Sequence, residues 1–168
     1  EYAAKADILI RRENGWELIE VKSATAKKIL GRNGERKSPA ASRDVADFVD
    51  DMAYTALIAK KNGLPVTGTR LMLLSGTFQL GMAPGRLFAS FDFTPEVKNR
   101  VAEFEALLDP AAAMLSQPDA PAFALTGDCR KCEFFGRCLD LPDDYTIFDI
   151  PRLQEKQLRE LFGQGIVR

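Results

Sequence analysis

The sequence predicts a single α/β core, built as a mixed sheet flanked by helices, followed by a small cysteine-rich lobe. Two observations predict the core: short apolar runs typical of strands alternate with two longer stretches of helical periodicity. The expected strands are 7–10, 18–22, 70–75 and 87–93, and the expected helices are 44–62 and 94 to about 107 or 114. The third observation, three cysteines close together near the C-terminus, predicts the lobe. We divide the chain into a core at 1–109, a hinge and cysteine lobe at 110–150, and the start of a linker or further domain at 151–168.

Composition places the chain among ordinary globular domains. Its 168 residues are 46% hydrophobic and 28% charged, with a net charge of −1, which is enough apolar material for one core of moderate size. No run approaches the roughly eighteen apolar residues that span a bilayer, and no signal peptide is recognisable. Clustered cysteines without a disulfide pattern favour a reducing compartment. We therefore expect a cytoplasmic protein without a membrane partner.

The first two strands form the most informative part of the chain. Asn14-Gly15 is a strong hairpin signal, so the strand that begins at Asp7 should fold back antiparallel on the run Leu18 to Lys22. Residues two apart in a strand point to the same side, so Glu20 and Lys22 face together. The hairpin then brings Asp7 near Glu20.

These three side chains suit phosphoester chemistry. The carboxylates of Asp7 and Glu20 can hold Mg²⁺ or Mn²⁺, with a main-chain carbonyl of Ile19 or Val21 as a further ligand. The Lys22 ammonium can orient an attacking water or balance charge that builds on a phosphate. The alternative is a plain hairpin with a solvated Glu-Lys pair on its surface.

The remaining core elements follow from periodicity and capping. Asp44 to Asn62 has apolar residues at three-to-four spacing and Gly63 at its stop, which predicts an amphipathic core helix. A second helix starts at Thr94 as N-cap. We interpret Asp92, just before it, as a turn carboxylate and not as a metal ligand.

The three cysteines, Cys129, Cys132 and Cys138, have C-x₂-C-x₅-C spacing. An odd number of thiols so close together favours one metal centre over disulfides. The chain has no histidine, and both a zinc site and a cubane iron–sulfur cluster need a fourth ligand. Spacing leaves both metals open, and Asp128 is a candidate fourth ligand for zinc.

The stretch that follows the Glu20 strand is strongly basic. Seven basic residues stand against the single acid Glu35 between Lys22 and Arg43. Such a stretch beside a metal site fits the backbone of a nucleic acid, whose binding is driven by phosphate neutralisation. The alternative is a solvated loop that only aids solubility.

The pattern of Asp7 followed by Glu20-Val21-Lys22-Ser23 resembles the motif of RecB-like PD-(D/E)XK nucleases, and the cysteine triplet resembles that of AddB-type and CRISPR-associated members. The resemblance implies a restriction-endonuclease-like fold and Mg²⁺-dependent, exonuclease-like hydrolysis of DNA with single-stranded character, in DNA repair. It makes Asp7, Glu20 and Lys22 catalytic, with Asp7 and Glu20 on the metal. It also implies a [4Fe–4S] cluster at the three cysteines, with zinc as the alternative.

The resemblance also implies a fourth cysteine upstream of Asp7. The chain begins at Glu1 without an initiator methionine, so we expect an internal fragment of a longer polypeptide with further domains. Thr55 stands where these nucleases carry a glutamine, although Asp51 and Tyr54 on the same helix can still face the groove, and the chain has no histidine. Both departures favour a second hypothesis, a non-catalytic nucleic-acid-binding or scaffolding module with a structural zinc or iron–sulfur site. A third is a zinc-ribbon adaptor joined to an unrelated hairpin domain.

Overall fold

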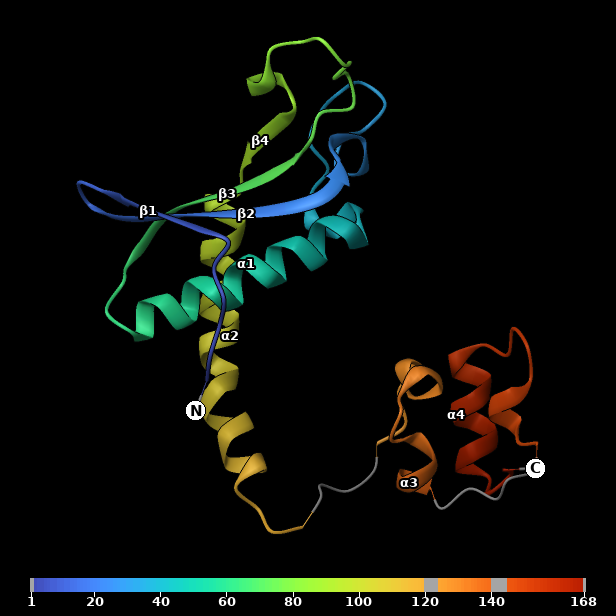
Figure 1. Ribbon diagram of the computed structural model, residues 1–168. Helices are drawn as coiled ribbons and strands as arrows, with labels where there is room; N and C mark the ends of the chain where they lie inside the picture. The colour runs from blue at the N-terminus through green and yellow to red at the C-terminus, as the bar shows by residue number, and fades with distance from the viewer. Residues whose placement is uncertain (1, 120–123, 140–144, 168) are drawn as a thin grey trace. The chain divides into compact units, whose positions relative to one another are not determined.

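The computed structural model describes residues 2–119, 124–139 and 145–167 (Figure 1). The chain divides into two compact units, Glu1–Leu115 and Ser116–Arg168. None of the helices in these described residues combines the length and the apolar character needed to cross a bilayer.

The first unit is built on a four-stranded mixed sheet. Its strands are β1 (Ile8–Arg12), β2 (Gly15–Thr25), β3 (Val66–Leu74) and β4 (Phe88–Asp92), in the spatial order β1-β2-β3-β4. The central pair, β2 and β3, is parallel, and the two outer pairs are antiparallel. The parallel pair needs a crossover connection, which α1 (Arg43–Lys61) supplies. The predicted mixed α/β sheet with helices packed on it is therefore confirmed.

Both long helices pack on the same face of this sheet. Figure 1 shows α1 crossing beneath the strands, with α2 (Thr94–Leu115) beside it. Period-two alternation turns Leu18 of β2 and Leu71 and Leu73 of β3 toward the helices, and all three are fully buried. They meet the buried apolar residues Val45, Val49, Met52, Ala53 and Ala56 of α1 and Val97 of α2. Because Glu20 and Lys22 share the parity of Leu18, their side chains belong to this same face.

The β1–β2 turn is one residue earlier than the sequence suggested. Arg12 pairs with Gly15, so Glu13 and Asn14 form the turn and Gly15 already belongs to β2. Gly15 has φ +144°, and a Cβ there would lie 2.7 Å from the Pro65 carbonyl oxygen. Glycine is thus required by a close backbone approach as well as by its conformation.

The start of α2 also differs in detail from the prediction. The helix begins at Thr94, and the Asp92 carboxylate accepts a hydrogen bond from the Thr94 N–H at 2.8 Å. The Thr94 hydroxyl instead accepts the Thr69 N–H of β3 at 3.0 Å. Asp92 therefore caps the helix, as a turn carboxylate, while Thr94 ties the helix to the sheet. Pro110, which the sequence placed in the hinge, lies inside α2.

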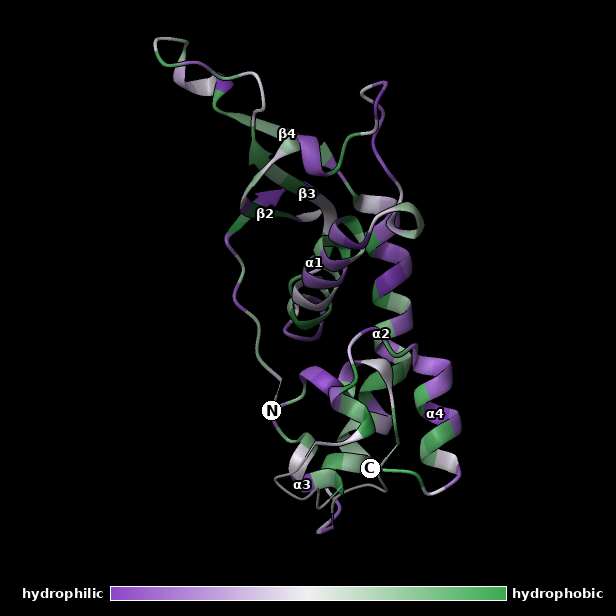
Figure 2. Ribbon diagram, turned by 90° about the vertical axis from the view of Figure 1, so that its right-hand side faces the viewer, coloured by the Kyte–Doolittle hydropathy of each residue, from purple (hydrophilic) through white to green (hydrophobic). Residues whose placement is uncertain are grey.

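The second unit has its own small core. Ile147, Phe148 and Leu158 are buried in it, and the rings of Phe135 and Phe148 meet edge to face with centroids 4.6 Å apart. Its α-helices are α3 (Phe135–Leu139) and α4 (Glu155–Gly163). Figure 2 shows hydrophilic and hydrophobic residues around α4, and the apolar side supplies Leu158 to the core. α4 is therefore a part of this unit.

Candidate functional site

The β1–β2 register brings Asp7 beside Glu20. Ile8 pairs with Ile19, so one further step along the antiparallel ladder sets Asp7 opposite Glu20. Asp7 lies just before β1, and its Oδ2 accepts the backbone N–H of Val21 at 2.9 Å. This hydrogen bond fixes the carboxylate at the edge of β2, next to Glu20.

Glu20 and Lys22 form an ion pair on the helix-covered face of β2. Lys22 Nζ lies 2.8 Å from Glu20 Oε1. Glu20 is only 8% exposed, which is unusual for a carboxylate and is tolerated because Lys22 neutralises it. Glu20 and Lys22 point to the same side of β2, as the sequence predicted.

A second carboxylate reaches the same lysine from α1. Asp51 Oδ2 lies 2.7 Å from Lys22 Nζ. The resemblance placed Asp51 near the groove, but the pairing with Lys22 joins residues far apart in the chain and could not be read from local pattern. The presence of an acidic residue on this helix was the available signal.

The two carboxylates decide the charge state of Lys22. Burial alone would lower the pKa of Lys22, but hydrogen bonds to Asp51 and Glu20 outweigh it, and the pKa is raised above its ordinary value. The side chain is therefore an ammonium at neutral pH. It can donate hydrogen bonds and stabilise negative charge, and it does not serve as a proton acceptor.

A cavity of about 550 Å³ opens at this point of the first unit. Its walls come from the N-terminal segment, β2, α1 and α2. They comprise Ala3, Ala4, Lys5, Glu20, Asp50, Asp51, Tyr54, Thr55 and Phe104. Thr55, at the position where a glutamine was expected by resemblance, is buried in this wall. Asp50 is occupied elsewhere, since Arg100 Nε and Nη2 bind its two oxygens at 2.7 and 2.9 Å.

The donor set at Asp7 and Glu20 fits a hard cation that retains several waters. Both ligands are carboxylates, and Mg²⁺ commonly takes one or two of these and keeps water on its other positions. Among the described residues, no three Asp, Glu, Cys or His side chains are grouped so as to hold a metal.

The basic stretch after β2 separates into two kinds of side chain. Arg36 is bound to Glu96 at 2.7 Å and Lys28 to Asp44 at 3.3 Å, so both serve the fold. Lys27, Arg32 and Arg43 make no ion pair within the described part of the chain. Lys37 Nζ donates a hydrogen bond to the Lys28 carbonyl oxygen at 3.0 Å, so Lys27, Arg32 and Arg43 are the cations of this stretch left for an external anion.

The cysteine segment lies in the second unit. Cys129 is in the 3₁₀ helix Gly127–Lys131, Cys132 follows it, and Cys138 is in α3; all three are free thiols. Cys129 Sγ accepts the Thr126 N–H at 3.2 Å. The three thiols are not gathered into a metal-binding group in the residues described.

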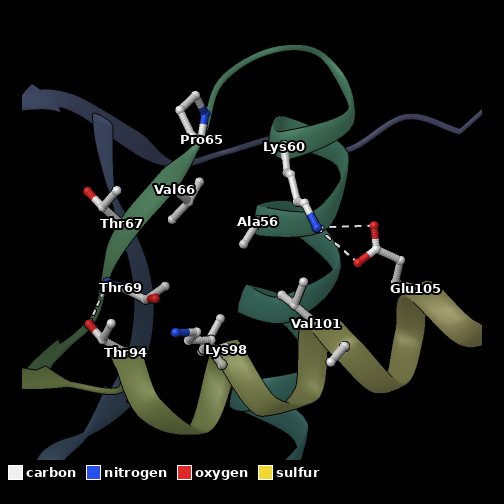
Figure 3. Close-up of a pocket in the computed structure, with 12 residues that line it drawn as sticks. Ala56, Lys60, Pro65, Val66, Thr67, Thr69, Thr94, Lys98, Val101 and Glu105 are labelled. Carbon is white, nitrogen blue, oxygen red and sulfur yellow. Dashed lines mark hydrogen bonds and ion pairs between the residues drawn. The ribbon is translucent and has the colours of Figure 1, made fainter. Parts of the chain in front are cut away.

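A second cavity, also of about 550 Å³, is apolar and lies between α1, β3 and α2 (Figure 3). Its walls include Ala56, Val66 and Val101, and its Lys60 is bound to Glu105 at 2.9 Å. Glu105 is the acidic residue among those labelled in Figure 3, and its carboxylate faces Lys60.

Comparison with known proteins gives no match to this chain among protein-family models, curated proteins or solved structures.

Proposed function

We propose that this chain is a metal-dependent nuclease with a restriction-endonuclease-like core of the RecB-like PD-(D/E)XK type. The observation that carries the proposal is the convergence of Asp7 and the Glu20–Lys22 pair across one hairpin. Two carboxylates and a protonated lysine are the groups that metal-assisted phosphodiester hydrolysis requires. The sheet, with a parallel central pair joined through a helix, supports the same assignment.

Asp7 and Glu20 would hold Mg²⁺ or Mn²⁺, and a carbonyl of Ile19 or Val21 would add a ligand. When bound, the metal polarises the phosphoryl group and favours ionisation of water. Lys22 donates a hydrogen bond to the attacking water or to a phosphate oxygen, which offsets the developing negative charge. Water attacks phosphorus, the bond to the leaving oxygen breaks, and that oxygen takes up a proton.

DNA is the proposed substrate, in an exonuclease-like reaction on ends with single-stranded character and in a DNA-repair setting. Support comes from Lys27, Arg32 and Arg43, the cations of the basic stretch that the fold does not use. Binding through these groups would neutralise phosphates without reading sequence, and would weaken as salt rises.

For the cysteine segment we propose a [4Fe–4S] cluster held by Cys129, Cys132 and Cys138, with zinc as the alternative and a structural role in either case. Metal binding by thiolates is coupled to folding, so the segment would close around its metal. Arg130, between two of the cysteines, has buried Nε and Nη2 atoms with no hydrogen-bond partner among the residues that the structure describes, which suits a neighbouring anionic centre. Iron, sulfide and zinc analysis of anaerobically purified protein, with Cys132→Ser beside it, separates the two metals.

The test of the nuclease is cleavage of fluorescent single- and double-stranded DNA with Mg²⁺ or Mn²⁺, comparing the wild-type protein with Asp7→Ala and Lys22→Ala. Asp47→Ala is the control, because Asp47 is an exposed acid of α1 without an ion pair in the described residues. We expect metal-dependent cleavage that Asp7→Ala abolishes, that Lys22→Ala slows severely but measurably, and that the control retains. Cleavage at the wild-type rate in Asp7→Ala and Lys22→Ala would overturn the assignment.

The second candidate is a non-catalytic nucleic-acid-binding or scaffolding module. The specific observation in its favour is that Lys22 is held by two carboxylates, so its charge is already satisfied before any substrate binds. This module would bind DNA in the same fluorescence assay, show no cleavage with either metal, and be insensitive to Lys22→Ala.

A further inference from the structure

We propose that Asp51 is a positioning residue for Lys22 in the nuclease site. This inference rests on the proposed function and deepens it. It assigns to α1 the task of holding the lysine of β2 in the orientation that the reaction needs.

The geometry gives Lys22 two anchors from different elements. Its Nζ lies 2.8 Å from Glu20 Oε1 on its own strand and 2.7 Å from Asp51 Oδ2 on the packed helix. With Glu20 alone, the ammonium could swing around one carboxylate and cover both of its oxygens. The second anchor lies on α1, so it restricts this movement of Nζ.

The remaining donor of Lys22 is what the reaction would use. An ammonium has three N–H groups, and the two carboxylates take two of them. The third has no acceptor among the described residues, and the side chain retains 28% exposure toward solvent. Two fixed donors restrict the direction of the third, so it can be aimed at a water or a phosphate oxygen.

The other charged groups around this lysine do not take over the role. Asp50, the neighbouring acid on α1, is occupied by Arg100 from α2. Lys5 of the N-terminal segment lines the cavity as a like charge, and Tyr54 is the remaining titratable group on its wall. Asp51 is therefore the second carboxylate that Lys22 contacts.

A purely structural reason for the Asp51–Lys22 pair is weak. The Asp51 side chain is 58% exposed, and an ion pair made by so exposed a carboxylate contributes little to the stability of a fold. Removing the Asp51 carboxylate should thus leave the protein folded, which makes its effect on the reaction measurable.

The test combines single-turnover cleavage rates with a double-mutant cycle. The variants are Asp51→Ala, Asp51→Glu, Lys22→Ala and Asp51→Ala/Lys22→Ala, with Asp47→Ala as the control for loss of one acid from α1. DNA affinity is measured separately by fluorescence anisotropy with Ca²⁺ in place of Mg²⁺. This separates binding from the cleavage step.

We expect Asp51→Ala to slow cleavage roughly 10- to 100-fold, the cost of a mispositioned group, with DNA affinity unchanged. Asp51→Glu should recover much of the rate because a longer carboxylate can still reach Nζ. In the Lys22→Ala background, loss of Asp51 should have no further effect, since residues that act as one unit are not additive.

The outcomes separate the two proposals. Wild-type protein without metal-dependent cleavage overturns the nuclease and this inference together. Cleavage by the wild type that Asp51→Ala and Asp47→Ala leave equally unchanged overturns the inference alone. A rate loss that adds fully to that of Lys22→Ala also overturns it, because Asp51 would then act independently of the lysine.

Discussion

The guanidinium of Arg36 lies over the ring of Phe93, 4.2 Å from the ring centroid, and Arg36 Nη2 is 2.7 Å from Glu96 Oε1. Phe93 is fully buried between β4 and α2. The basic stretch that follows β2 is therefore fastened to the core at this point by a cation–π contact and an ion pair.

Replacing Arg36 with alanine should destabilise the first unit by about 1–3 kcal/mol, because the Glu96 carboxylate loses its cation and Phe93 loses its cover. Arg36→Lys should cost less, since it keeps the charge and loses the planar stacking. Urea unfolding followed by tryptophan fluorescence measures both. Equal stability of wild type and Arg36→Ala would show that the contact does not fix the loop.

Arg32 is expected to behave in the opposite way. It makes no ion pair in the described residues, so Arg32→Ala should leave the free energy of unfolding unchanged. If it contacts a phosphate, the slope of log K against log salt for DNA binding should fall by about 0.7–0.9. Anisotropy titrations at several salt concentrations measure the slope, and an unaltered slope would remove Arg32 from the interface.

The Asp92 cap predicts a pH-dependent contribution to stability. Hydrogen bonds from the Thr94 hydroxyl and backbone N–H hold the pKa of Asp92 below its ordinary value. A lowered folded-state pKa stabilises the protein above the unfolded-state pKa of about 3.9, and this contribution is lost as pH falls through the folded value. Asp92→Asn should retain the cap, but its free energy of unfolding should fall less steeply as the pH is lowered. Asp92→Ala should have a free energy of unfolding about 1 kcal/mol below that of the wild type at pH 7. Urea midpoints from pH 7 to pH 3 test this, and identical acid slopes for wild type and Asp92→Asn would contradict it.

Gly34, in the loop after β2, is a control for the requirement for glycine at position 15 in the hairpin. Both have positive φ, at +144° and +81°, but only at Gly15 would an added Cβ meet the backbone, at 2.7 Å from Pro65 O. Gly15→Ala should lower the free energy of unfolding by several kcal/mol, because strain and overlap combine. Gly34→Ala should lower it by only about 1 kcal/mol, the cost of the left-handed conformation. Thermal unfolding of both variants gives the comparison. Similar losses would show that the approach of Pro65 is not what requires glycine.

Leu158 supports the core of the second unit. Leu158 is 1% exposed and packs in a core with few other buried side chains. Leu158→Ala should therefore lower the free energy of unfolding of this unit by about 2–5 kcal/mol. We expect limited proteolysis to cleave within 116–168 while the first unit stays intact. Leu80→Ala, at a fully exposed leucine, is the control and should leave the digestion pattern of wild type. Simultaneous loss of both units in Leu158→Ala would show that they unfold together.

The sequence by itself determined the elements and the order in which they occur. Period-two alternation around Glu20 and three-to-four spacing after Asp44 are local properties, so the hairpin, the long helix and the co-facing of Glu20 and Lys22 could be derived from residue types alone. The proximity of Asp7 to Glu20 followed as well, because an antiparallel hairpin has only a few possible registers, whereas the hydrogen bond from the Val21 N–H to Asp7 was not predicted.

Only the tertiary structure decided which acids meet which bases. The pairing of Asp51 with Lys22, the diversion of Arg36 to Phe93, and the exchange of roles between Asp92 and Thr94 each depend on how a helix packs on the sheet. Side-chain charge does not specify a partner at a distance in sequence; the partner is set when burial of Leu18, Leu71 and Leu73 fixes α1 and α2 on one face.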